Sequence, residues 1–75
     1  MESISGVGVL DKSIVVLSAL AATENGLTLT ELQESTALPR ATAHRLAGAL
    51  EQHGLVRRNA EGRYVLGLGL NALAA

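Results

Sequence analysis

The sequence predicts a mainly α-helical fold that closes with a small β-hairpin. Three observations support this: helical apolar spacing over residues 9–22, signals for two further helices between residues 28 and 53, and two short β-type runs around a polar loop. Seventy-five residues allow one domain with a small core. Because the chain has one tyrosine and no phenylalanine or tryptophan, that core must be mainly aliphatic.

The first expected helix, over residues 9–22, has more apolar surface than one buried face needs. One stripe consists of Leu10, Ile14, Leu17 and Ala21, and a second consists of Val15, Val16 and Leu20. A surface helix needs a single stripe. The helix is therefore either central to a small core or in contact with another chain or domain. Residues 1–8 contain glycine and serine, and we expect a flexible arm there.

The second expected helix begins at a capping box. In Thr28-Leu29-Thr30-Glu31, the threonine oxygen can accept an amide hydrogen bond and the glutamate can reach back to the amide of the cap. This helix should end near Ser35 or Thr36. Residues 27–29 can form one short strand before it.

A turn at residues 36–38 leads to the third expected helix, over residues 39–53. Pro39 belongs in its first turn, where the missing N–H of proline costs nothing. Gly54 follows at the C′ position, which favours positive φ, and should end the helix there.

The third helix has an apolar back and a cationic front. At roughly 100° per residue, Arg40, His44 and Arg45 share one side with the small residues Ala41 and Gly48. The apolar residues Ala43, Leu46 and Leu50 lie opposite. Small residues allow close approach while the long side chains reach past them. The major groove of DNA fits such a face, because guanine presents acceptors that suit a bidentate arginine.

This geometry predicts Arg40 and His44 at base edges and Arg45 on a phosphate or a guanine. Other interpretations stay open at this point. Arg45 can instead pair with a glutamate of the preceding helix, and His44 can be an exposed bystander. Thr42 can pack or bond locally, or its hydroxyl can reach a phosphate near the start of the helix.

The two β-type runs, residues 55–58 and 63–66, flank the loop Asn59-Ala60-Glu61-Gly62. Strand alternation places Val56, Tyr64 and Leu66 inward and Arg57 and Arg63 outward, and leaves Arg58 undecided. A basic hairpin beside a DNA-reading helix forms a wing that contacts the phosphate backbone or the minor groove. The alternative is an edge hairpin with solubilising charge. The predicted architecture is thus a winged helix-turn-helix of three helices with a two- or three-stranded wing.

Charge is divided unevenly along the chain, although the net charge is only −1. Residues 1–39 carry one lysine against five acidic residues, a balance of −4. Residues 40–75 carry five arginines against two glutamates, a balance of +3. Such polarity is typical of a protein with one face on a phosphate backbone. Ordinary solvated charge is the alternative.

Several function classes are disfavoured by the sequence. Without cysteine there is no disulfide, zinc-thiolate or thiol-redox site. His44 and His53 project about 180° apart on one helix and cannot share a metal ion. No phosphate loop or carboxylate pair suggests an enzyme. The apolar run at residues 14–22 is too short to span a bilayer, and no signal-peptide pattern opens the chain. We therefore expect a cytoplasmic protein.

A set of short segments resembles the amino-terminal winged helix-turn-helix domain of the isocitrate lyase regulator (IclR) family of bacterial transcription regulators. They occur in the family's order and at nearly its spacing: residues 10–14 (LDKSI), 29–32 (LTEL), 38–42 (LPRAT), 44–46 (HRL), 53–56 (HGLV) and 62–67 (GRYVLG). The resemblance covers about residues 9–73. No single motif is specific, but their joint order is.

The resemblance implies a homodimer on a pseudo-palindromic operator, with the first helix near the dimer seam. It implies a domain over residues 9–67 and a linker helix over residues 68–75, leading to a carboxy-terminal domain that binds a small effector. No cofactor is expected within these 75 residues. The expected DNA-contacting residues are Arg40, Ala41, Thr42, His44, Arg45, Arg57, Arg58 and Arg63. A winged helix that docks on proteins is the alternative function.

Three positions depart from the family pattern. Gln33 replaces the alanine that usually allows the two helices of the motif to pack closely. Ala37 replaces the usual turn glycine, which predicts a strained turn or a turn of another type. Ala41 replaces a frequent serine and removes a possible phosphate hydrogen bond.

Overall fold

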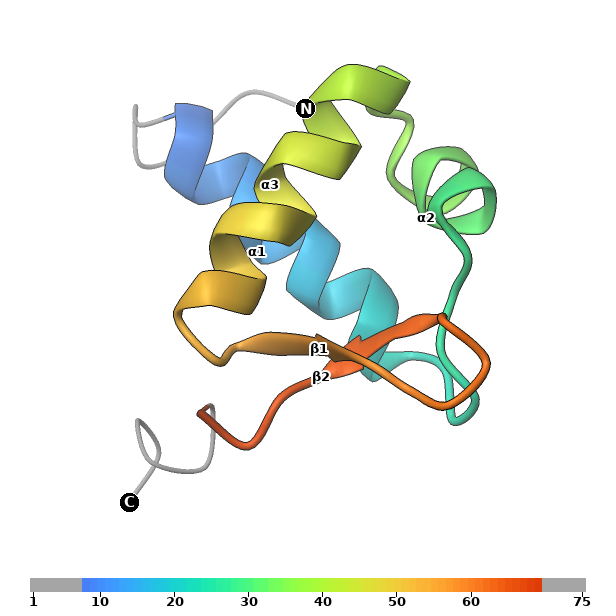
Figure 1. Cartoon of the computed structure of the whole chain (residues 1–75). Coiled ribbons are helices and arrows are strands. Elements are labelled where there is room, and N and C mark those ends of the chain that lie inside the picture. The colour runs from blue at the N-terminus through green and yellow to red at the C-terminus, as the bar shows by residue number, and fades with distance from the viewer. Residues whose placement is uncertain (1–7, 70–75) are drawn as a thin grey trace.

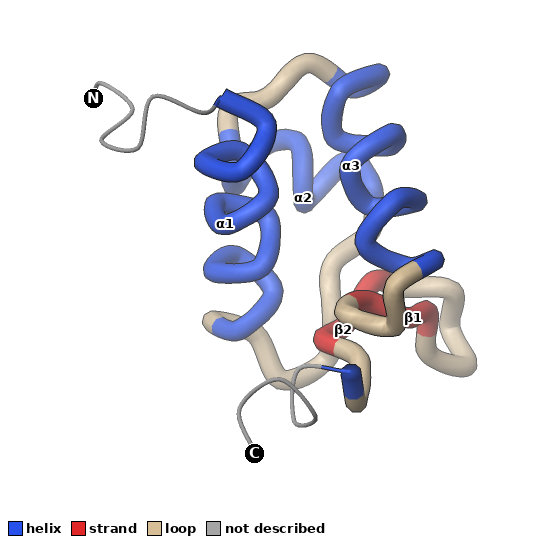
Figure 2. The backbone as a smooth tube through the Cα atoms, turned by 90° about the vertical axis from the view of Figure 1, so that its left-hand side faces the viewer, coloured by secondary structure: helices blue, strands red, loops and turns tan. Residues whose placement is uncertain are grey.

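Three helices and a two-stranded antiparallel hairpin make up the fold (Figure 1). This computed structural model describes residues 8–69. The elements are α1 (Gly8–Ala21), α2 (Leu29–Thr36), α3 (Arg40–Gln52), β1 (Val56–Arg58) and β2 (Tyr64–Leu66). Each helix packs against the other two, and Figure 2 shows the hairpin beside the carboxy-terminal end of α3. The predicted fold class and order of elements are confirmed.

The two ends of the chain fall largely outside this description. Residues 1–7 of the expected arm and residues 70–75 of the expected linker helix lie outside the described residues. Gly8, which the sequence assigned to the arm, is the first residue of α1. Leu68 is 77% exposed.

Of the two apolar stripes of α1, the one with Val16 and Leu20 faces the core. These side chains are 0% and 2% exposed, whereas Leu10 and Ile14 are each 52% exposed. Val16 and Leu20 join a cluster completed by Leu32, Ala47, Leu50, Val56 and Tyr64. Helix α1 is therefore central to the core. Of its other apolar stripe, Leu17 packs against the core cluster, whereas Leu10 and Ile14 face outward.

Helix α2 begins at the predicted capping box. The amide of Glu31 donates to Thr28 Oγ1 over 3.1 Å, and the amide of Thr28 donates to Glu31 Oε1 over 2.9 Å. The helix ends at Thr36. The next residue, Ala37, has φ 59° and ψ 23°, and its amide donates to the Gln33 carbonyl over 2.9 Å. Within residues 8–69, Ala37 is the one non-glycine residue with positive φ. Of the two alternatives, a strained turn or a turn of another type, the structure therefore has the strained turn.

Helix α3 starts one residue later than predicted. Pro39 is its N-cap, with φ −59° and ψ 148°, and so does not lie within the first turn. The extended ψ of Pro39 lets its carbonyl accept the first helical hydrogen bond, from Ala43 over 2.9 Å. At the other end, Gly54 has φ 74°. Its amide donates to Glu51 and that of Leu55 donates to Leu50, each over 3.0 Å, which is a Schellman motif.

The hairpin pairs Val56 with Leu66, Arg57 with Val65 and Arg58 with Tyr64. The strand expected at residues 27–29 is reduced to one bridge, in which Leu27 and Tyr64 exchange hydrogen bonds of 3.0 and 2.8 Å. It stops there because Thr28 already serves as the cap of α2. Gly26 has φ 83°, and a Cβ placed on it would lie 2.7 Å from the Tyr64 carbonyl oxygen. This close approach requires glycine.

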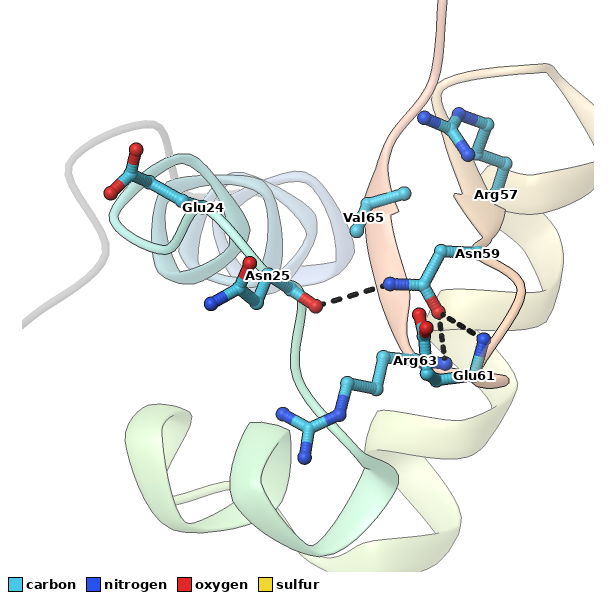
Figure 3. Close-up of a pocket in the computed structure, with 7 residues that line it drawn as sticks. All are labelled: Glu24, Asn25, Arg57, Asn59, Glu61, Arg63 and Val65. Atoms are coloured by element: carbon cyan, nitrogen blue, oxygen red, sulfur yellow. Dashed lines mark hydrogen bonds between the residues drawn. The ribbon is translucent and has the colours of Figure 1, made fainter.

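Asn59 holds the tip of the hairpin in place (Figure 3). Its Oδ1 accepts from the amides of Glu61 and Arg63 over 3.0 and 2.9 Å. Its Nδ2 donates to the carbonyl of Asn25 over 3.1 Å. One side chain thus closes the loop and fastens it to the segment that follows α1.

We predict that Ala37→Gly raises the free energy of unfolding by about 0.5–1 kcal/mol. The left-handed conformation costs alanine about 1–2 kcal/mol, which exceeds the extra freedom of glycine in the unfolded chain, about 0.4–1 kcal/mol. Urea denaturation followed by far-ultraviolet circular dichroism measures the change.

Gly54→Ala is the matched control, because Gly54 is the residue with positive φ at the end of α3, as Ala37 is at the end of α2. A Cβ there would have only the Gly69 Cα nearby, at 3.9 Å. The substitution therefore isolates the backbone effect and should lower the free energy of unfolding by a similar amount. A stabilising effect of Gly54→Ala, or none from Ala37→Gly, would contradict the assignment of strain.

Candidate nucleic-acid interface

The two sides of α3 differ as the helical spacing predicts. Ala43 and Ala47 are 0% exposed and Leu50 is 8% exposed, so the back of the helix is buried. Arg40, Ala41, His44 and Arg45 are exposed, and Thr42 is half-buried. Because the buried back consists of two alanines and a leucine, the helix packs closely and its front stands clear of the core.

Arg40 lies at the start of α3 and reaches toward α2. Its Nη1 donates a hydrogen bond of 3.1 Å to Thr30 Oγ1, in the first turn of α2. Both residues are exposed. Helical spacing predicts Arg40 on the front of the helix but does not predict this partner, because only the folded chain brings positions 30 and 40 together.

Glu31 of α2 forms an ion pair with an arginine, but that arginine is Arg63 and not Arg45. Within residues 8–69 the one ion pair joins Arg63 Nη1 to Glu31 Oε1, over 3.5 Å. The interpretation of Arg45 as the partner of a preceding glutamate is therefore wrong for the described residues. Arg45 and His44 both stand exposed on the front of α3.

Gly48 lies inside α3, where neither its φ nor a close neighbour requires a glycine. A Cβ added to it would have no heavy atom within 4 Å. Glycine in a helix interior costs about 1 kcal/mol relative to alanine. Because Gly48 has no side chain and Ala41 has only a methyl group, the surface of the helix between the longer side chains of His44 and Arg45 projects little.

Arg57 and Arg58 occupy opposite sides of β1. Arg57 is exposed, as expected. Strand alternation left the side of Arg58 undecided. In the structure Arg58 lies on the same side of the hairpin as Tyr64, with which it pairs. Its guanidinium carbon lies 4.7 Å from the Tyr64 ring centroid, and its Nη2 donates to Tyr64 Oη over 2.7 Å. Arg58 therefore covers the one aromatic ring of the chain and is less free than Arg57.

Arg63 is less exposed than predicted. Its side chain is 39% exposed and that of its partner Glu31 is 45% exposed. The ion pair connects the tip of the hairpin to the capped end of α2. The sequence predicts the capping role of Glu31 but not Arg63 as its partner, because no local pattern relates residue 31 to residue 63.

These partners lower the pKa of Glu31 from its ordinary value of 4.5. The hydrogen bond from the Thr28 amide is the largest cause. Partial desolvation opposes it, while the charge of Arg63 and the Thr28 side chain act in the same direction as the amide. The carboxylate is therefore stabilised in its ionised form.

A hollow between the segment after α1 and the hairpin is lined by charges of both signs (Figure 3). It is lined by Glu24, Asn25, Arg57, Asn59, Glu61, Arg63 and Val65. Arg57 and Arg63 lie at opposite ends of it in Figure 3. Since two glutamates offset two arginines, the hollow has no single charge that would select an anion or a cation.

Metal and membrane sites find no support in the described region. Among residues 8–69 no three histidine, aspartate or glutamate side chains gather closely enough to hold an ion. Within the same residues we find no helix with the length and hydrophobicity that a bilayer span requires.

The sequence matches a known family. A family model described as the IclR helix-turn-helix domain matches residues 9–60. The chain is also similar to the HTH-type transcriptional regulator KipR of Bacillus subtilis (strain 168), with 45% identity over 42 residues. That match covers 56% of this chain and 17% of KipR.

Solved structures agree with this match. An IclR family transcriptional regulator from Brucella abortus superposes with a TM-score of 0.80 at 34% identity, covering 89% of this chain and 26% of that one. The repressor BlcR of Agobacterium tumefaciens gives a TM-score of 0.80 at 27% identity, covering 93% of this chain and 28% of BlcR. The chain therefore spans about a quarter of the length of these regulators.

We predict that Glu31→Gln lowers stability at neutral pH and that the loss shrinks in acid. Glutamine can still accept the cap hydrogen bond, but it has no charge for Arg63. Because the pKa of Glu31 is lowered on folding, its ionised form stabilises the fold above pH 4.5. That contribution disappears as the pH falls through the lowered pKa. Urea denaturation of both proteins at intervals from pH 7 to pH 3 measures the difference.

Glu34→Gln is the matched control, since Glu34 is an exposed residue of the same helix. It should change stability less than Glu31→Gln at pH 7. A stability difference between wild type and Glu31→Gln that stayed constant from pH 7 to pH 3 would exclude the proposed role of the charge.

Proposed function

Because the chain belongs to the family of IclR helix-turn-helix domains, we propose that it reads double-stranded DNA with α3 in the major groove. DNA binding by a transcription regulator is the function that this family membership supports. The observation that carries the proposal is the exposed front of α3, which presents two arginines and a histidine opposite a buried back. In this arrangement a recognition helix contacts base edges with residues near its amino-terminal end.

We assign the base-reading role to Arg40 and His44, and a phosphate or guanine contact to Arg45. Arginine can donate two hydrogen bonds to guanine O6 and N7. Ala41 and the open position at Gly48 allow the helix axis to approach the groove. Thr42 is half-buried and lies beside the start of the helix, where its hydroxyl would meet a phosphate.

The hairpin is proposed to lie along the phosphate backbone, as a wing. Arg57 is its foremost contact, because its side chain is exposed and, unlike the exposed Arg58, is not stacked on Tyr64. Arg58 and Arg63 belong to the same surface, but each is held by a partner, Tyr64 and Glu31 respectively. Contacts of this kind fix the register of the protein on DNA and carry no sequence information.

Arg40→Ala should relax discrimination at one base position of the bound site by about 1–3 kcal/mol. Selection of bound sequences from a random DNA pool first defines the site, and competition between single-base variants of that site then measures discrimination. Unchanged discrimination at every position would exclude Arg40 as a base-reading residue.

Arg57→Ala is the matched variant in the wing. It should weaken binding to all sequences alike and lower the slope of log affinity against log salt by about 1. An altered base preference would refute the wing assignment. If the wild-type chain selected no DNA sequence and bound DNA without salt dependence, a protein-docking winged helix would be favoured instead.

We further propose a homodimer that forms through the outer face of α1. Val9, Leu10, Ile14 and Val15 are 69%, 52%, 52% and 43% exposed, which is a large apolar surface for one short helix. Contiguous exposed apolar residues favour an interface. A two-fold dimer would place two copies of α3 on the two half-sites of a pseudo-palindromic operator.

Our proposals for the whole protein are based on the similar regulators. The chain spans 26% of the Brucella regulator, so we propose a further domain that binds a small effector in the whole protein. We favour repression as the outcome, since BlcR is described as a repressor. We also propose a cytoplasmic protein without catalytic activity, in keeping with a domain that regulates transcription.

Ile14→Glu should convert the dimer to a monomer without unfolding the chain. The side chain is 52% exposed, so a charge there is tolerated by the monomer but would face its own copy across the interface. Analytical ultracentrifugation measures the oligomeric state. Lys12→Glu, at an exposed position on another side of α1, is the control and should leave the dimer intact. If the wild-type 75-residue chain sedimented as a monomer at all concentrations, the proposal that this chain dimerises through α1 would be refuted.

A further inference from the structure

The first turn of α2 holds one of the arginines proposed to read DNA. Thr30 Oγ1 accepts the 3.1 Å hydrogen bond from Arg40 Nη1, and the two residues come from different helices of the motif. An arginine side chain is long and flexible, so a fixed acceptor removes much of its freedom. The bond therefore gives Arg40 a preferred direction before any partner arrives.

Thr30 is itself held firmly. It lies between Thr28 and Glu31, whose reciprocal hydrogen bonds of 3.1 and 2.9 Å close the capping box. Leu32, two residues further on, is 0% exposed and anchors α2 in the core. The backbone that carries the Thr30 hydroxyl is thus fixed on both sides, although the side chain is exposed.

The contact leaves most of the Arg40 guanidinium available. Arginine has five N–H donors in a planar fork, and Thr30 occupies one of them. The remaining donors can still form a bidentate pair with a base. Orientation of the fork is what makes such a pair specific, because both hydrogen bonds must be aligned at once.

We propose that Thr30 is a positioning residue that orients Arg40 for base reading, so that α2 contributes to sequence specificity without touching a base. The proposal rests on the proposed function, in which Arg40 reads a base. Side-chain ordering at an interface costs free energy that a preoriented residue has already lost. Thr30 would therefore sharpen discrimination at the base that Arg40 contacts and at no other.

The test compares Thr30→Val, which removes the hydroxyl and keeps the shape, with Thr30→Ser, which keeps the hydroxyl. The probe is the DNA site selected by the wild-type 75-residue chain, together with its single-base variants. Thr30→Val should reduce discrimination at one base position by about 2- to 10-fold, the range expected for one ordered side chain. Thr30→Ser should restore it. Ser35→Ala, which removes an exposed hydroxyl from the last turn of α2, should change nothing.

A double-mutant cycle with Arg40→Ala shows whether Thr30 affects base discrimination through Arg40. If Thr30 acts through Arg40, Thr30→Val has no further effect on discrimination in the Arg40→Ala background. Equal weakening of all sequences would make Thr30 a phosphate contact and overturn the proposal. So would additive effects in the cycle, or full discrimination in a Thr30→Val protein.

Folding and function are checked separately. Far-ultraviolet circular dichroism and urea midpoints confirm that each variant folds. Should the wild-type chain select no DNA sequence, the proposed function itself fails. Should the wild type select a site that Thr30→Val reads equally well, only the positioning role of Thr30 fails.

Discussion

Two hydrogen bonds that Thr28 and Glu31 exchange at the start of α2 constrain the rest of the structure. They end the extended segment after its single pairing with β2, at Leu27, and turn the chain directly into a helix. The same glutamate forms an ion pair with Arg63 at the tip of the hairpin. Residues 27–31 therefore hold the helix-turn-helix unit and the hairpin in place relative to each other. The relative placement of these two parts decides which side chains can face one duplex.

Features that depend on neighbouring residues could be predicted from the sequence. The capping box, the strained turn at Ala37 and the end of α3 before Gly54 each follow from the backbone preferences of a few adjacent residues. The front and back of α3 follow from helical periodicity in the same way, since Ala43 and Leu50 are buried and Arg45 is exposed. The order of motifs was enough to indicate the family.

Features that depend on distant residues could not be predicted. The pairing of Arg63 with Glu31, the contact of Arg58 with Tyr64 and the bond from Arg40 to Thr30 each join two separate elements. Periodicity alone also could not tell which apolar stripe of α1 faces inward, since both have helical spacing. Pro39 suits either the N-cap or the first turn, and the choice depends on how the preceding turn closes. Three arginines of the candidate interface thus have partners that only the folded chain shows.

Tyr64 is the one aromatic residue in the chain, and it lies where the hairpin meets the core. Its side chain is 3% exposed and lies under the guanidinium group of Arg58. Every tyrosine absorption, emission or near-ultraviolet dichroism signal of the chain therefore arises from this single point, whereas the far-ultraviolet signal arises mainly from the helices. Optical spectroscopy can follow detachment of the hairpin separately from loss of the helices, without an added label.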